Sequence, residues 1–178
     1  VSAGTGNAIL GNSIFGNGDL GIDWFPVGPT LNDTGDGDDG FNELQNYPVI
    51  SAVVNSFPSV TLTGSIQSKP STVFRLEFFG NAVANRSGFG EGEFFLGSID
   101  VTTDPSGDAS YSVTLSTPGT PATGAFTATA TYPARNTSEF SPAFRPKLPN
   151  HSPRMPVLSG DSVPIRERVG PGPRRGQC

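Results

Sequence analysis

The sequence is poor in the residues that build disulfides, zinc sites and histidine-based catalysis. Its 178 residues include one cysteine, Cys178, and one histidine, His151. These counts exclude an internal disulfide, a zinc site made of several Cys or His ligands, and a His-dependent triad in the body of the chain. No apolar run of about 18 residues occurs, so no membrane-spanning helix is predicted.

Charged residues are also scarce, and they are unevenly placed. They make up 15% of the chain, which argues against a helical bundle or a coiled coil. Residues 1–145 hold 14 acidic and five basic side chains, a net charge of −9, whereas residues 146–178 carry +4. Because an acidic body repels phosphate groups, no nucleic-acid partner is predicted.

Glycine and asparagine form a short repeat in residues 1–24. A Gly-Asn pair recurs every five residues, beginning at Gly6, and Ile9 and Ile14 each follow an Asn by two places. Gly and Asn tolerate the left-handed backbone of tight corners, so the pattern predicts one coil of a β-helix. The alternative is a Gly/Asn-rich loop. One coil cannot bury its apolar face alone, so we expect upstream coils of the same parent protein to pack on it.

Residues 48–145 contain seven β-like runs at nearly regular spacing, which predicts a seven-stranded β-sandwich. Apolar residues alternate along them, so that Phe74 and Phe78 share one face while Arg75 and Glu77 share the other. The runs span residues 49–54, 60–66, 73–79, 94–103, 111–115, 126–132 and 137–144.

The last part of the chain, residues 146–178, differs abruptly in composition. It contains seven prolines, four glycines and six basic residues without apolar periodicity, which predicts a disordered tail. The change also raises the hypothesis that this tail is translated from a shifted reading frame. We interpret the whole chain as a piece of a longer protein.

Eight short sequence words follow one another between about residues 6 and 144. They are GNSI at 11–14, NGDLGID at 17–23, NDTGD at 32–36, LQNYPV at 44–49, EFFGN at 77–81, GEG at 90–92, FLG at 95–97 and NTSEFS at 136–141. As an ordered set they resemble the C-terminal end of large bacterial surface proteins with right-handed parallel β-helix repeats.

That resemblance implies an all-β chain in three parts. Residues 1–24 correspond to the terminal coil of a right-handed parallel β-helix, residues 25–47 to an acidic linker loop, and residues 48–145 to an Ig-like sandwich. The family is extracellular and largely structural, and its pattern supplies no catalytic residues that can be placed here. The basic tail departs from the family.

The acidic linker loop at residues 25–47 is the best candidate site. Four neighbouring carboxylates repel one another, and a hard divalent cation such as Ca²⁺ relieves that repulsion. Part of the loop loosely follows an EF-hand register, although Asn32 replaces the usual first Asp and no flanking helices are predicted. The alternative is a solvated acidic hinge. The candidate calcium ligands are Asp33, Asp36, Asp38, Asp39 and Glu43.

Other acidic and aromatic residues are weaker candidates. Glu91 and Glu93 form a carboxylate pair of the kind that glycosidases use, but they lie in a glycine-rich stretch and are interpreted as an exposed loop. Glu139 is expected to tie a loop at the edge of the sandwich. Trp24 is expected to cover the open end of the β-helix core, with sugar stacking as the alternative.

These features predict a non-enzymatic secreted or cell-surface module that works in display, spacing or adhesion. Its expected partner is an unidentified surface ligand or glycan, and its expected location is extracellular or the bacterial cell surface. The alternative is the accessory, glycan-binding C-terminal region of a β-helix polysaccharide lyase or hydrolase. The active site of such an enzyme would lie on upstream coils.

Overall fold

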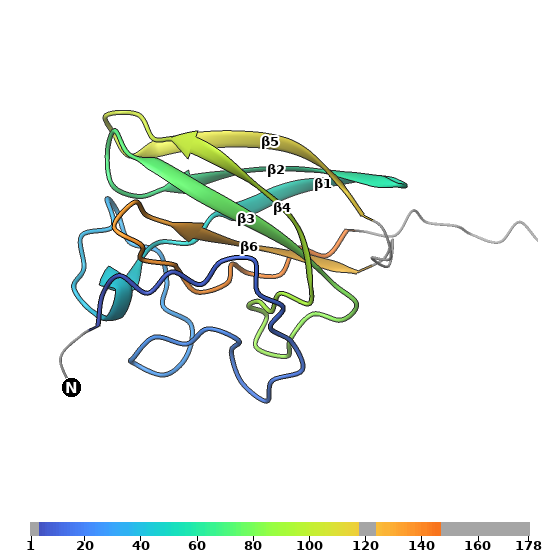
Figure 1. Cartoon of the computed structure of the whole chain (residues 1–178), viewed down its shortest axis with the longest axis horizontal. Coiled ribbons are helices and arrows are strands. Elements are labelled where there is room, and N and C mark those ends of the chain that lie inside the picture. The colour runs from blue at the N-terminus through green and yellow to red at the C-terminus, as the bar shows by residue number, and fades with distance from the viewer. Residues whose placement is uncertain (1–3, 118–123, 147–178) are drawn as a thin grey trace, which may run out of the picture. The chain divides into compact units, whose positions relative to one another are not determined.

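The computed structural model describes residues 4–117 and 124–146, and within these residues the chain is all-β (Figure 1). The tail at residues 147–178 lies outside the described residues. None of the described helices is long and apolar enough to cross a membrane. The regular elements are η1 (Phe41–Leu44), β1 (Val49–Ser56), β2 (Ser59–Gln67), β3 (Val73–Asn81), β4 (Phe94–Thr102), β5 (Asp108–Ser116) and β6 (Ala125–Thr131).

Two three-stranded antiparallel sheets, ordered β1-β2-β5 and β4-β3-β6, form the body of the described residues (Figure 1). One apolar cluster draws buried side chains from both sheets, an arrangement consistent with a β-sandwich. Each side chain of this size contributes about 1.5–3 kcal/mol when it is fully buried. The predicted alternation is confirmed on β2 and β3, which place Val60, Leu62, Ile66, Phe74, Leu76 and Phe78 in this core.

Strand β3 is buried on both faces over most of its length, which the alternation did not predict. Glu77 was placed on an outer face with Arg75, yet its relative exposure is 0%. The reason is that residues 4–32, called the N-terminal segment below, cover this face. Its Gly11 N–H donates to Glu77 Oε2 at 2.7 Å, and Arg75 Nε donates to Glu77 Oε1 at 2.9 Å.

A second, smaller apolar cluster joins the N-terminal segment to the sandwich. It consists of Ile22, Phe79 and Phe140, with the rings of Phe79 and Phe140 in edge-to-face contact at 5.3 Å. The close approach of Phe140 requires glycine at position 92, because a Cβ there would lie 2.8 Å from the Phe140 ring. The glycine-rich stretch around Glu91 is therefore a packed part of the structure.

The N-terminal segment contains no regular strand, and nothing in residues 4–24 identifies a β-helix coil. Its five-residue repeat nevertheless has a structural counterpart. Gly6, Gly11 and Gly16 all adopt positive φ, between 61° and 78°, which favours glycine. Each donates its N–H to a side-chain oxygen of the sandwich, namely Asn136 Oδ1 at 2.6 Å, Glu77 Oε2 at 2.7 Å and Glu91 Oε2 at 3.0 Å respectively.

Residues 137–144 do not form the predicted seventh strand. They run antiparallel to β6 through isolated bridges, at Thr137 and at Phe144. Between these bridges serine hydroxyls replace carbonyls as acceptors: Ser138 Oγ receives Ala130 N–H and Ser141 Oγ receives Ala128 N–H, both at 3.0 Å. Side-chain bonding interrupts the regular ladder, while the edge of β6 stays covered.

Candidate metal centre

The acidic loop is held against the sandwich by amide side chains. Asn46 Oδ1 accepts the N–H of Asp33 at 3.0 Å, and Asn46 Nδ2 donates to the carbonyl of Asp33 at 2.8 Å. Asn32 makes a matching pair with the backbone of Tyr47, at 2.8 and 2.9 Å. Gly35 N–H donates to Gln67 Oε1 at the end of β2, at 3.0 Å. The loop therefore has a defined conformation.

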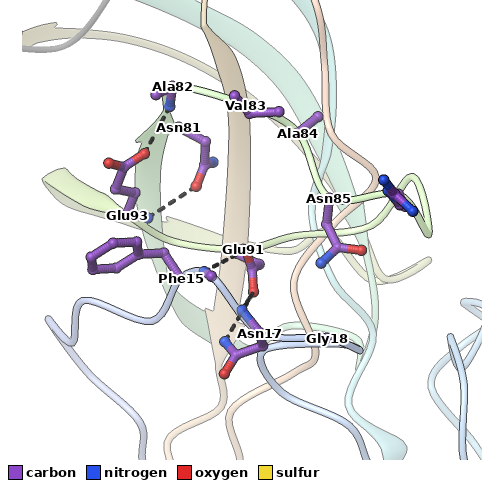
Figure 2. A pocket seen from close by; sticks show the side chains of 12 residues that line it. Phe15, Asn17, Gly18, Asn81, Ala82, Val83, Ala84, Asn85, Glu91 and Glu93 are labelled. Carbon is purple, nitrogen blue, oxygen red and sulfur yellow. Dashed lines mark hydrogen bonds between the residues drawn. The ribbon is translucent and has the colours of Figure 1, made fainter.

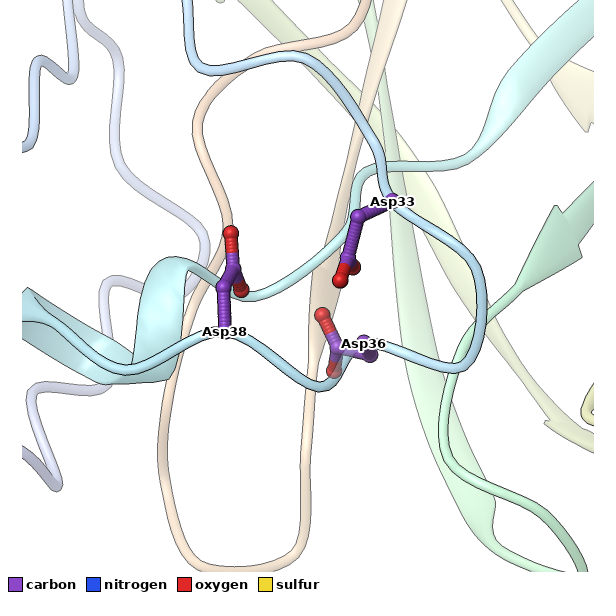
Figure 3. Close-up of side chains that lie close together, drawn as sticks. All are labelled: Asp33, Asp36 and Asp38. Atoms are coloured by element: carbon purple, nitrogen blue, oxygen red, sulfur yellow. The ribbon is translucent and has the colours of Figure 1, made fainter.

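Three carboxylates of this loop converge (Figure 3). One oxygen each of Asp33, Asp36 and Asp38 lies within 4.8 Å of the others. Calcium binds oxygen at about 2.3–2.6 Å, so two ligands of one ion lie at most about 5 Å apart. The spacing of these three side chains therefore suits a single calcium ion.

The oxygens of the three carboxylates are unequally satisfied. Both oxygens of Asp36 accept a hydrogen bond, Oδ1 from Asn46 N–H at 2.7 Å and Oδ2 from Ser68 Oγ at 2.8 Å. By contrast, Asp33 Oδ1 and Asp38 Oδ1 are shielded from solvent and accept no hydrogen bond from the described residues. Buried oxygens without a donor are costly, and a cation between them offsets that cost.

The electrostatics of the loop also disfavour three bare charges. Burial raises the pKa of Asp36, against the hydrogen bonds from Ser68 and Asn46, which lower it. Burial and then the charge of Asp33 raise the pKa of Asp38. Both shifts have the direction expected of carboxylates that a metal ion would stabilise in their charged form.

The other two predicted ligands lie outside this group. Asp39 is exposed, and Glu43 forms an ion pair with Lys69, whose ammonium lies 4.7 Å from the centre of the Tyr132 ring. Glu43 also lies in η1, where Asn42 and Glu43 have positive φ values of 49° and 56°. The EF-hand register does not describe this arrangement, because the side chains of Asn32 and Glu43 bind protein groups.

Three buried glutamates serve the fold, and sequence reasoning found the role of only one. Glu139 ties a loop as expected: it accepts Trp24 N–H at 2.8 Å and Thr30 N–H at 2.9 Å. Glu77 and Glu91 act likewise on the glycine repeat, and nothing in the sequence identifies either of them as its acceptor. Trp24 packs on the second apolar cluster, and its Nε1 donates to the carbonyl of Thr137 at 3.2 Å.

The carboxylate pair of the glycine-rich stretch is also bound by protein groups. Glu91 was interpreted as exposed, but it is buried and accepts the N–H groups of Gly16 and Asn17 at 3.0 and 2.8 Å (Figure 2). Glu93 Oε2 accepts Ala82 N–H at 2.8 Å. Glu91 was placed wrongly because the covering segment lies more than 70 residues away in the sequence, with a separation of 75 for Gly16.

In comparisons with known proteins, no family model matches the chain, and no curated protein matches it at a significant level. The site is therefore interpreted from its own geometry.

Proposed function

We propose that this chain is a calcium-stabilised, non-enzymatic structural or adhesion module of a secreted or cell-surface protein. The observation that carries the proposal is the cluster of Asp33, Asp36 and Asp38, with two shielded oxygens that lack a hydrogen-bond donor. The loop that holds them connects the N-terminal segment to β1, so a bound ion would fix the conformation of that connection. Calcium at extracellular concentration fills even weak sites of this kind.

We further propose that the N-terminal segment is the end of a parallel β-helix whose other coils lie upstream. Three glycines at intervals of five residues support this, because all three have a positive φ. Ile9 and Ile14 follow these corners and both pack on the second apolar cluster. Repeated corners with inward isoleucines are typical of stacked β-coils.

The decisive experiment is thermal unfolding of the full chain with calcium and with a chelator. Calcium at 100 times its dissociation constant adds about 2.7 kcal/mol to the free energy of unfolding, so the wild-type melting temperature rises. Asp33→Asn and Asp38→Asn abolish that rise. In chelator, Asp38→Asn melts above the wild type, because one repulsive charge is gone.

The matched control is Asp39→Asn, which removes the same charge from the same loop at an exposed position outside the cluster. This variant keeps the calcium response. A wild-type melting temperature that is the same with calcium and with chelator would contradict the proposed function, as would equal loss of the response in all three variants.

A further inference from the structure

A hollow of about 550 Å³ lies between the N-terminal segment and the connection from β3 to β4 (Figure 2). A second hollow, of about 390 Å³, adjoins it, because Gly18, Asn85 and Arg86 line both. We call the two together the Arg86 groove. Its size falls within the range of about 300–1,000 Å³ that is typical of small-molecule sites.

Polar side chains in this groove have unused hydrogen-bonding capacity. The guanidinium of Arg86 makes no hydrogen bond or ion pair with the described residues, although it carries five N–H donors. Glu93 uses Oε2 for Ala82 N–H and keeps Oε1 free, and Asn17 donates from Nδ2 to Glu91 while its Oδ1 stays available. Donors and acceptors therefore line the same hollow.

An apolar side chain completes the lining. Phe15 is 58% exposed at the edge of the hollow (Figure 2), and Val83 on the opposite wall is exposed as well. A flat aromatic ring in contact with water offers dispersion contacts to the C–H face of a sugar ring. Nothing in the packing of the described residues requires Phe15 to be aromatic.

We propose that the Arg86 groove binds a neutral oligosaccharide. A sugar hydroxyl both donates and accepts, so neighbouring hydroxyls can bond Arg86 and Glu93 together, whereas an apolar ligand can satisfy neither. Two adjoining hollows suit a chain of several sugar units. The second hollow is also lined by Asp19 and Asp23, and this negative charge disfavours acidic saccharides.

An extended peptide fits the groove less well. Peptides that bind through their backbone add to an open strand edge, but the lining consists of loop residues and of Asn81 at the end of β3. Asn81 is itself engaged, since its Oδ1 accepts Glu93 N–H at 2.9 Å. No lining residue belongs to the acidic cluster, so saccharide binding does not depend on the calcium proposal.

The test titrates the full chain with cellohexaose, laminarihexaose, mannohexaose, chitohexaose, hexagalacturonate and a ten-residue Ser/Thr peptide. Amide chemical shifts locate the binding, and calorimetry measures it, in calcium and in chelator. We expect at least one neutral hexasaccharide to shift the resonances of residues 15–19 and 81–87 in both conditions. Phe15→Ala and Arg86→Gln each lower its affinity about tenfold, a loss of about 1.4 kcal/mol.

The matched controls are Phe57→Ala and Arg145→Gln, which remove an exposed aromatic ring and an exposed cation outside the groove. Both controls keep the wild-type affinity. The proposal is overturned if no neutral saccharide shifts these resonances at about 10 mM, if only hexagalacturonate or only the peptide binds, or if the controls lose as much affinity as the groove variants.

Discussion

At the scale of single residues, Asn42 shows how one buried amide can fasten three parts of the chain. Its relative exposure is 0% and its φ is 49°, a left-handed value that Asn tolerates better than most residues. Its Oδ1 accepts from the N–H and the Nδ2 of Asn7, both at 3.0 Å. Its Nδ2 donates to the carbonyls of Asn7 at 2.8 Å and Thr137 at 3.0 Å.

We expect Asn42→Ala to lower the free energy of unfolding by about 3 kcal/mol, because it leaves buried partners unsatisfied and keeps a left-handed backbone without Asn. Urea unfolding followed by circular dichroism measures the change. The matched control is Asn12→Ala, whose exposed side chain bonds only the carbonyl of Leu10. A change above about 1 kcal/mol in the control, or below it in Asn42→Ala, would contradict this role.

At the scale of elements, the positions of the strands could be predicted from the sequence, but the packing of the N-terminal segment on β3 could not. The alternation of apolar and polar residues predicted β2 and β3 to within two residues of their observed ends, because the alternating burial of a strand depends on neighbouring residues in the sequence. The burial of Glu77 depends on Gly11, which is 66 residues away. A single sequence carries no signal for such a contact, and an isolated Glu on a strand is ordinarily exposed.

The candidate site was predictable to a similar extent. The density of Asp residues located the loop, but it did not distinguish the three carboxylates that converge from Asp39 and Glu43, which do not join them. That distinction depends on the hydrogen bonds that orient Asp36, which come from Asn46 near the end of the loop and from Ser68 beyond it. The interruption of strand pairing by serine hydroxyls along residues 137–144 could not be predicted either, because the composition of this segment is typical of a strand.

We expect the contact between the N-terminal segment and the sandwich to depend on pH through Glu139, which accepts the N–H groups of Trp24 and Thr30. Burial, the largest cause, raises the pKa of this carboxyl above its ordinary value of 4.5, against the hydrogen bonds from Thr30 and Trp24. A carboxyl with a raised pKa in the folded state adds stability that is fully present below its ordinary pKa. That stability is lost as the pH rises through the raised value.

We therefore expect the advantage of the wild type over Glu139→Gln to shrink as the pH rises. The free energy of unfolding of both proteins is measured by urea titration between about pH 4 and pH 7. The Gln side chain places its N–H₂ group against an N–H donor that the wild-type carboxylate accepts, which changes the free energy of unfolding by the same amount at every pH. The titration of Glu139 is therefore seen only in how the difference between the two proteins varies with pH. A difference that is constant across this range, or that grows with pH, would contradict the assignment.

At the scale of the whole molecule, the N-terminal segment stabilises the sandwich as well as lying on it. Ile22 shares the second apolar cluster with Phe79 and Phe140, and the segment supplies the N–H groups that Glu77 and Glu91 accept. Residues 4–117 and 124–146 accordingly belong to one compact unit. Removal of the segment exposes to solvent a face of β3 and β6 whose side chains are buried in the structure.

We expect deletion of residues 1–24 to lower the free energy of unfolding by at least about 3 kcal/mol, because two large aromatic side chains lose their cover. Guanidinium unfolding of the full chain and of the shortened chain measures the difference. The shortened protein should also bind a dye that reports exposed apolar surface. An unchanged unfolding midpoint would contradict a stabilising role for the segment.

The long-range attachment of the N-terminal segment has a consequence for the order of folding during synthesis. The ribosome makes this segment before the sandwich, and its acceptors follow much later, up to 130 residues downstream for the pair of Gly6 and Asn136. Contacts so distant in sequence form slowly and late. The glycine N–H groups of the segment therefore stay in water until both sheets have formed, so these residues fold after the sandwich although they are translated before it.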